Sequence, residues 1–236
     1  MINVFGRPIG APSHLTRLVL LSALSVALMM LDHRGHHLEK IRAGLNTLAY
    51  PIQLIAATPA YVVGGLADFF TTRGTLLDTT PELFDTHIAV NLRGPFFAMQ
   101  AAVADMVERG TAGSIVNILS QSAHVGQSFL VPYSASKAAL ANLTKNVAQS
   151  FRAQRIRCNG VMAGWMDTPG EHAIQKRAHD APDDWLAKAE AARPMGQLIK
   201  PDELAGLVSY MLSPESGVMT GALVDYDQWV PGAQPE

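Results

Sequence analysis

This chain of 236 residues has a single cysteine and few charges of either sign. Cys158 alone excludes a disulfide within the chain and a zinc site built from several cysteines. Eighteen basic residues against 20 acidic ones give a net charge of −2, so we expect no nucleic-acid partner. The histidines at 33, 36 and 37 follow no recognised ligand spacing, and we predict no metal site. A hydrophobic content of 48% excludes a disordered chain, and the length fits a domain with a sizeable core.

Two long uncharged stretches set residues 1–72 apart from the rest of the chain. The first, Leu18–Leu31, is apolar on all sides, as is typical of a membrane helix or a buried one. As a helix it covers about 21 Å, which is short of the ~30 Å hydrocarbon core, but Arg17 can snorkel and lengthen the span. We therefore expect an uncleaved membrane anchor at 18–31, with a buried core helix or a secretory signal as the alternatives.

The second uncharged stretch contains Pro51, Pro59 and the pair Gly64-Gly65. Prolines break a soluble helix but are tolerated in membrane helices. We expect Gly44–Ala67 to form either a second, kinked span or an interfacial amphipathic segment. The protein would then be membrane-associated if the 18–31 segment inserts, and cytoplasmic otherwise.

Short motifs around these stretches carry a resemblance. Phe5-Gly6-Arg7, Leu31-Asp32-His33-Arg34, Tyr50-Pro51 and Thr58-Pro59 resemble the start of the rod-shape-determining protein MreC. That family has a cytoplasmic tail, one transmembrane helix, a periplasmic coiled coil and β-barrels. The resemblance implies that residues 1–72 form a helical membrane-anchor-like segment in front of a separate domain at 73–236.

The pattern then changes to strands that alternate with helices, which favours an α/β fold with a parallel sheet. Thr79-Thr80-Pro81-Glu82 predicts a helix start, and the helical pattern runs to Glu108 with a bend at Gly94-Pro95. The remaining expected elements are strands at 114–119, 156–162 and 222–224, and helices at 133–154, within 167–193 and from 201.

A phenol and an ammonium group are placed for acid–base chemistry. Tyr133 and Lys137 are four residues apart, so on a helix they share one face, about 5–6 Å apart at Cβ. A neighbouring cation stabilises the phenolate, which can then exchange a proton with an alcohol or carbonyl oxygen. Ser120 ends the preceding strand, where its hydroxyl can reach the same oxygen, and Asn91 lies in the helix before that strand.

These residues, with Asn159-Gly160 to Thr168, resemble the short-chain dehydrogenase/reductase family from about Gly74 to Gly232. The resemblance implies hydride exchange between NAD or NADP and an alcohol or carbonyl compound, a sugar or polyol among the possibilities. It makes Tyr133 the acid/base and Ser120 the group that orients the substrate. Lys137 would assist Tyr133 and bind the nicotinamide ribose, and Asn91 would anchor a relay water. Gly164 and Thr168 would contact the cofactor, and helices 81–108 and 133–154 would join two subunits.

The sequence also departs from that family. Ala163 stands where a proline is usual, and the glycine-rich turn that lets a backbone approach the pyrophosphate is missing. We therefore expect a partial Rossmann-type sheet in which strand 114–119 presents an open edge, with weak cofactor binding and impaired activity. NAD and NADP are not distinguished.

Three functions remain open from the sequence. The chain is an oxidoreductase of the short-chain type, a membrane-anchored cell-shape protein similar to MreC, or a catalytically inactive fusion fragment that only associates. The cell-shape function needs a coiled coil after residue 77, and 79–106 carries no sustained heptad repeat.

Overall fold

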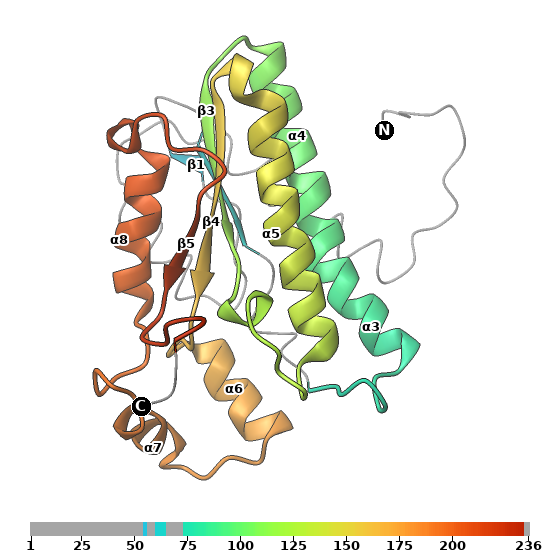
Figure 1. The fold of residues 1–236 in the computed structure, drawn as a ribbon, viewed down its shortest axis with the longest axis vertical. Helices are drawn as coiled ribbons and strands as arrows, with labels where there is room; N and C mark the ends of the chain where they lie inside the picture. Colours follow the sequence, from blue (N-terminus) through green and yellow to red (C-terminus); the bar gives the residue numbers. More distant parts are fainter. Residues whose placement is uncertain (1–53, 56–59, 65–72, 234–236) are drawn as a thin grey trace.

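The computed structural model describes residues 54–55, 60–64 and 73–233. In this part a sheet is covered by helices on both faces: α4 and α5 lie on one face and α8 on the other (Figure 1). The strands are β1 (Leu54–Ile55), β2 (Ala60–Gly64), β3 (Gly113–Ile118), β4 (Ile156–Ala163) and β5 (Leu223–Tyr226). The helices are α3 (Pro81–Ile88), α4 (Gly94–Glu108), α5 (Val131–Phe151), α6 (Pro169–Ala178), α7 (Trp185–Ala191) and α8 (Pro201–Leu212).

Local signals place the first helices. The Thr80 hydroxyl accepts a hydrogen bond from the Leu83 amide and caps α3, with Pro81 in the first turn. One π-helical turn, Ala89–Arg93, joins α3 to α4 directly before Gly94-Pro95. Because proline has no amide hydrogen, it cannot close the regular helical bond there, which explains the change of geometry at the predicted bend.

The sheet runs in the order β1-β2-β3-β4-β5, with parallel pairing from β2 to β5 and an antiparallel β1 at its edge. β2 pairs with β3 over five residues, from Ala60 with Ser114 to Gly64 with Ile118. The expectation of an open edge at strand 114–119 was therefore wrong, because a strand supplied by the segment before residue 72 covers that edge.

The structure also corrects part of the prediction for residues 1–72. Residues 60–64 form a strand, not a membrane helix, since the tyrosine and two valines at 61–63 suit extended backbone better than helix. Within the residues that the structure describes, none of the helices is both long and apolar enough to cross a bilayer. The anchor predicted at 18–31 lies outside the described residues.

Two apolar clusters hold the helices to the sheet. On one face, buried side chains of α4 and α5, among them Met106 and Leu140, pack on Ile115 and Cys158 of the strands. Burial raises the pKa of the Cys158 thiol to about 12, as expected for a core residue and not for a nucleophile. On the other face, α8 packs on β3, β4 and β5.

Arg157 of β4 ties the end of α8 to the sheet. Its guanidinium donates hydrogen bonds to the carbonyl oxygens of Met211 (3.0 Å), Met219 (3.2 Å) and Ser213 (3.0 Å). The bonds to Met211 and Ser213 satisfy carbonyl oxygens at the end of α8, where no further helical turn supplies amide donors, and the bond to Met219 holds the segment that follows. Partial burial lowers the pKa of Arg157 from its usual value, but a guanidinium remains charged at neutral pH.

We predict that Arg157→Met destabilises the protein by about 2–3 kcal/mol, because partly buried carbonyls lose a charged donor. The free energy of unfolding from urea titration measures this loss. Arg109→Met is the matched control, since Arg109 forms an exposed ion pair with Asp105 and its removal has little effect. Equal stability of the two variants would contradict the role given to Arg157.

Candidate functional site

A cavity of about 750 Å³ opens where β3, β4 and β5 end. Its wall includes Ser120 after β3, Tyr133 of α5, Ala163 and Gly164 at the end of β4, and Asp227 after β5. Parallel strands present their carboxyl ends at one edge of a sheet, which is the usual place for a ligand in an α/β fold. The sheet therefore brings together residues that are far apart in the sequence.

Ser120 and Tyr133 line this cavity together. The Ser120 side chain caps the short helical turn 121–123: its Oγ accepts hydrogen bonds from the Ser122 amide (3.2 Å) and the Ser122 hydroxyl (2.8 Å). With both bonds accepted, the Ser120 hydroxyl hydrogen remains available for an oxygen in the cavity. Tyr133 is largely buried, and its ring meets that of His87 edge-on at 6.0 Å between centroids.

Lys137 lies behind Tyr133 in the interior. It is completely buried, and its Nζ donates a hydrogen bond to the carbonyl oxygen of Ile118 at 3.1 Å. The same nitrogen lies 5.7 Å from the centre of the Tyr133 ring. The two side chains share one face of α5, as their spacing predicts, and the ammonium group joins the helix to the end of β3.

Asn91 reaches the same helix through a chain of hydrogen bonds. It lies in the π-helical turn, is fully buried, and donates from Nδ2 to the Ser136 hydroxyl at 3.1 Å. Ser136 in turn donates to the carbonyl oxygen of Tyr133 at 2.7 Å. The Asn91 Oδ1 atom has no hydrogen-bond partner among the described residues. A buried amide oxygen of this kind is a typical acceptor for an ordered water.

Of the two other residues predicted to contact the cofactor, Gly164 lies in the cavity wall and Thr168 does not. Gly164 lines the cavity, and the Asp227 carboxylate lies so close that a Cβ at Gly164 would be 2.2 Å from it. A side chain at this position would require the Asp227 carboxylate to move, which favours glycine here. Thr168 is buried, and its hydroxyl accepts from the Glu171 amide at 3.1 Å and caps α6. His124 contacts Asp225 at 3.1 Å and is not part of the cavity wall.

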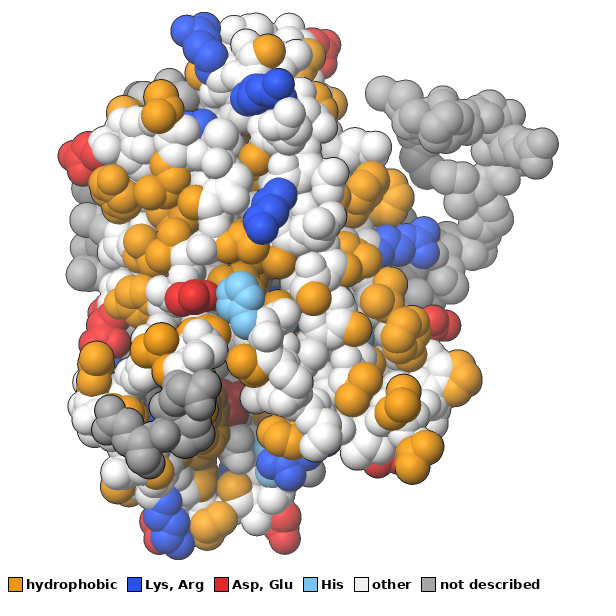
Figure 2. Space-filling model, in the orientation of Figure 1, with side chains coloured by type: hydrophobic (Ala, Val, Ile, Leu, Met, Phe, Trp, Pro, Cys, Tyr) orange, Lys and Arg blue, Asp and Glu red, His pale blue; other side chains and the backbone are white. Residues whose placement is uncertain are grey.

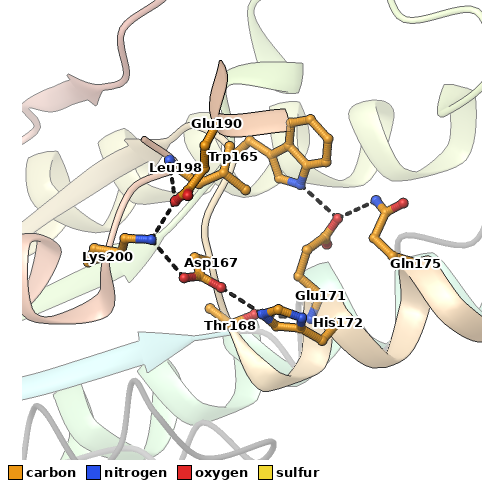
Figure 3. A network of polar contacts seen from close by, with 9 residues as sticks. All are labelled: Trp165, Asp167, Thr168, Glu171, His172, Gln175, Glu190, Leu198 and Lys200. Atoms are coloured by element: carbon orange, nitrogen blue, oxygen red, sulfur yellow. Dashed lines mark hydrogen bonds and ion pairs between the residues drawn. The ribbon is translucent and has the colours of Figure 1, made fainter. Parts of the chain in front are cut away.

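A polar network fixes the segment after β4, which the sequence predicts to be helical and which forms α6 and α7 (Figure 3). Lys200, just before α8, contacts Asp167 at 2.8 Å and Glu190 at 2.6 Å, and Asp167 also contacts His172 at 2.7 Å. Asp167 and Lys200 are 33 residues apart, so no local pattern shows this contact in advance. The network joins α6, α7 and the start of α8.

The sequence interpretation did not single out several cavity residues, although Trp165 lies inside the segment up to Thr168 that carries the family resemblance. Trp165 follows β4, and its Nε1 donates to Glu171 at 2.7 Å. The Arg193 guanidinium lies over the Trp165 ring, with Cζ 5.1 Å from the ring centre. Ligand sites in parallel sheets lie at the carboxyl ends of the strands, so a tryptophan shortly after the predicted strand could have indicated this part of the cavity wall.

Among the described residues, no group of three His, Cys, Asp or Glu side chains could hold a metal ion.

The ionisation of Asp167 follows from this network. Burial opposes the charge on Asp167, but hydrogen bonds and charges of Lys200 and His172 outweigh it and lower the pKa of the carboxyl group. The Asp167 and Glu190 carboxylates raise the pKa of Lys200. A carboxyl group with a lowered folded pKa stabilises the fold above its unfolded pKa of about 3.9 and loses that effect as the pH falls through the folded value.

We predict that Asp167→Asn lowers the stability at pH 7 by about 1–2 kcal/mol, because two charged hydrogen bonds are weakened. The difference from the unchanged protein should shrink below about pH 4, where Asp167 itself becomes protonated. Denaturant unfolding at pH 3 and pH 7 measures both effects. Asp183→Asn, which removes an exposed carboxylate paired with Lys176, is the control that should change little.

Comparison with known proteins gives consistent matches. The family model described as enoyl-(acyl carrier protein) reductase matches residues 62–228. The (3R)-3-hydroxyacyl-CoA dehydrogenase of Mus musculus is 36% identical over 150 residues, 64% of this chain and 55% of that protein. The protein of the same name from Canis lupus familiaris is 34% identical over 194 residues, which cover 82% of this chain and 72% of the canine protein. The chain thus spans little more than half the length of the mouse relative.

A solved structure agrees with these relatives. The 3-ketoacyl-(acyl-carrier-protein) reductase of Brucella melitensis, complexed with NADH, is 25% identical with a TM-score of 0.62, covering 72% of this chain and 66% of that one. An alignment over 194 residues of a 236-residue chain necessarily includes residues before β2, and the family model begins at Val62. The expected start of the match near Gly74 was therefore too late. These comparisons give no support to the resemblance of residues 1–72 to MreC.

Proposed function

This chain belongs to the short-chain dehydrogenase/reductase family, and we propose that it is an oxidoreductase that exchanges a hydride between NAD(P) and an alcohol or carbonyl substrate. The observation that carries the proposal is the shared cavity of Ser120 and Tyr133, with the buried Lys137 behind them. A hydroxyl donor and an acid/base group at one cavity wall can serve one reacting oxygen. The proposed sites are therefore Ser120, Tyr133, Lys137 and Asn91.

The roles of the side chains follow from their positions. The free hydrogen of Ser120 would bind the substrate oxygen and hold it beside Tyr133, which gives or takes the proton as the carbonyl and alcohol interconvert. The Lys137 ammonium favours the phenolate form of Tyr133 and so lowers the cost of proton transfer. A water on the Asn91 Oδ1 atom would connect this pair to further proton carriers.

The described residues fit the nicotinamide ribose end of the cofactor. NAD(P), when bound, supplies the hydride donor or acceptor. Lys137 and Tyr133 would hold the nicotinamide ribose, and Gly164 gives the cavity a wall without a side chain. Thr168 caps α6 instead of lining the wall and stays a predicted contact. The glycine-rich turn for the pyrophosphate is absent from the 236-residue sequence, so we propose weak binding, with NAD and NADP unassigned.

The names of the relatives point to hydroxyacyl and ketoacyl thioesters as the first substrates to test. A sugar or polyol substrate stays a prediction from the sequence alone. We further propose that 73–236, together with β2, forms the catalytic domain. An inactive fragment that only associates is the competing function.

We predict that Tyr133→Phe lowers kcat for NADH-dependent reduction of a 3-ketoacyl thioester by about 10²–10⁴-fold, because the ring stays and only the acid/base group is lost. NADH oxidation followed by absorbance measures this rate. Tyr210→Phe is the matched control, since Tyr210 is half-exposed on α8 and away from the cavity.

Two results would count against the proposal. One is an unchanged rate in Tyr133→Phe. The other is a protein that binds neither NADH nor NADPH in a fluorescence titration and turns over no alcohol or carbonyl compound; this result would favour the fragment that only associates.

We also propose that α3, α4 and α5, which cover the predicted helices 81–108 and 133–154, form a contact between subunits. Hydrophobic side chains gather over α3 and α4 at the right of the view in Figure 2. Phe96 and Phe97 are each more than two-fifths exposed, and a shallow hollow of about 310 Å³ beside them is lined by Leu92 and Leu143 among others. Exposed apolar surface of this kind is typical of an interface.

We predict that Phe97→Glu shifts the protein to a monomer of 25.3 kDa, because a charge would be buried between subunits. Size-exclusion chromatography with light scattering measures the mass. Val218→Glu, at a fully exposed position after α8, is the control that should leave the oligomer intact. A monomeric unchanged protein would contradict the proposed interface.

A further inference from the structure

We propose that Arg193 binds an anionic group of the substrate, so that this site selects hydroxy or oxo compounds that carry a carboxylate or a phosphate. The inference rests on the proposed function, because it takes the cavity of Ser120 and Tyr133 as the substrate site. It assigns a specificity-determining residue in the segment after β4, at a distance from the acid/base pair.

The first observation is the position of Arg193. It lies just after α7 and lines the same cavity as Ser120 and Tyr133. Its guanidinium lies over the Trp165 ring, and the indole is itself held by the hydrogen bond from Nε1 to Glu171. An arginine supported on an aromatic face loses little freedom when it binds a ligand, since its planar fork is already oriented.

The second observation is that Arg193 has no counter-ion in the described part of the chain. No ion pair joins its guanidinium to a described carboxylate, and its Nε atom is buried with no hydrogen-bond partner there. A buried donor without a partner costs free energy, and the cost is larger for a charged group. An anion in the cavity supplies the acceptor that Arg193 lacks.

The third observation is that the carboxylates around Arg193 are engaged elsewhere. Glu171 Oε1 accepts from Trp165 and from Gln175, each at 2.7 Å, and Glu190 is bound to Lys200. Asp227 lies against Gly164 and accepts from the Gln228 amide at 2.7 Å. None of these recorded contacts joins a carboxylate to Arg193, so its guanidinium lies at the cavity wall without an ion-pair partner among the described residues.

A second arginine at the cavity has the same support. The Arg73 guanidinium lies over the Phe129 ring, with Cζ 5.3 Å from its centre, and both residues line the cavity. Arginine forks match the geometry of carboxylates and phosphates better than that of neutral groups. A carboxylate of a free oxo acid and a phosphate of a carrier thioester share this chemistry, and the experiment below separates them.

The test compares four substrates that share one reacting carbonyl: 3-oxobutanoate, its neutral methyl ester, its coenzyme A thioester and its neutral N-acetylcysteamine thioester. Each anionic compound forms a pair with the neutral compound named after it. In one of the two pairs, we expect kcat/KM of the unchanged protein to be higher for the anionic member than for the neutral one. In Arg193→Met that kcat/KM falls by about 10- to 100-fold, while the neutral partner keeps its rate. Arg193→Lys should recover part of the loss, since it retains the charge without the fork.

Lys188→Met is the matched control, because Lys188 is an exposed cation of α7 that pairs with Asp184. A loss confined to 3-oxobutanoate assigns a carboxylate, and a loss confined to the coenzyme A thioester assigns a phosphate. An equal loss for charged and neutral substrates would overturn the proposal and leave Arg193 a structural residue. Equal kcat/KM for both members of each pair in the unchanged protein would also overturn it, while the proposed function would stand.

If no turnover is found, that result counts against the proposed function alone. A binding measurement then still tests whether Arg193 binds an anion. The indole N–H resonance of Trp165 is followed by NMR during titration with 3-hydroxybutanoate and with coenzyme A. We expect a saturable shift that is absent in Arg193→Met and present in Lys188→Met. No shift with either anion would overturn the proposal.

Discussion

The parallel pairing of β3 with β4 is the constraint on which the site depends. It runs from Gly113 with Ile156 to Ile118 with Val161, and both strands are buried on the two faces of the sheet. In this register the chain leaves both strands at the same edge, so Ser120 and Gly164 reach one cavity from segments more than forty residues apart. A shift by one residue would exchange the faces of every side chain and would move apolar residues out of both clusters.

The second requirement is that α5 packs on this edge with a charged side chain inside it. Burying an ammonium group is costly unless it has acceptors, and the Ile118 carbonyl oxygen supplies one for Lys137. The same bond places the cation beside Tyr133. An uncharged side chain of similar length would fill the same space without the free-energy cost of burying an ammonium group. The buried lysine therefore fits the acid/base role proposed for Tyr133 better than a contribution to stability, because sites of such chemistry are where buried charges shift the pKa of a neighbouring group.

The sequence predicted the elements after residue 79 because their signals are local. Thr80 and Pro81 mark a helix start, and the Tyr133–Lys137 spacing defines a helix face that the structure reproduces. β2 was missed because an uncharged stretch with prolines was interpreted from its hydropathy alone, while a strand becomes recognisable only through its partner, here β3. Contacts such as that of Lys200 with Asp167 were out of reach for the same reason, since they link distant segments.

The two ends of the cavity are built by different means. The end proposed to hold the reacting groups rests on strand ends and α5, where buried packing leaves little freedom to the side chains. The opposite wall comes from α6, the segment after β4 and Arg193 just after α7, and polar contacts hold Trp165 and Gln175 in it. Glu171 accepts a hydrogen bond from Trp165, and the Arg193 guanidinium lies over the Trp165 ring, so the position of Glu171 on α6 influences where this cation lies. Polar contacts of this kind can be exchanged without disturbing the apolar core, so this wall can change while Ser120, Tyr133 and Lys137, the proposed reacting groups, keep their positions.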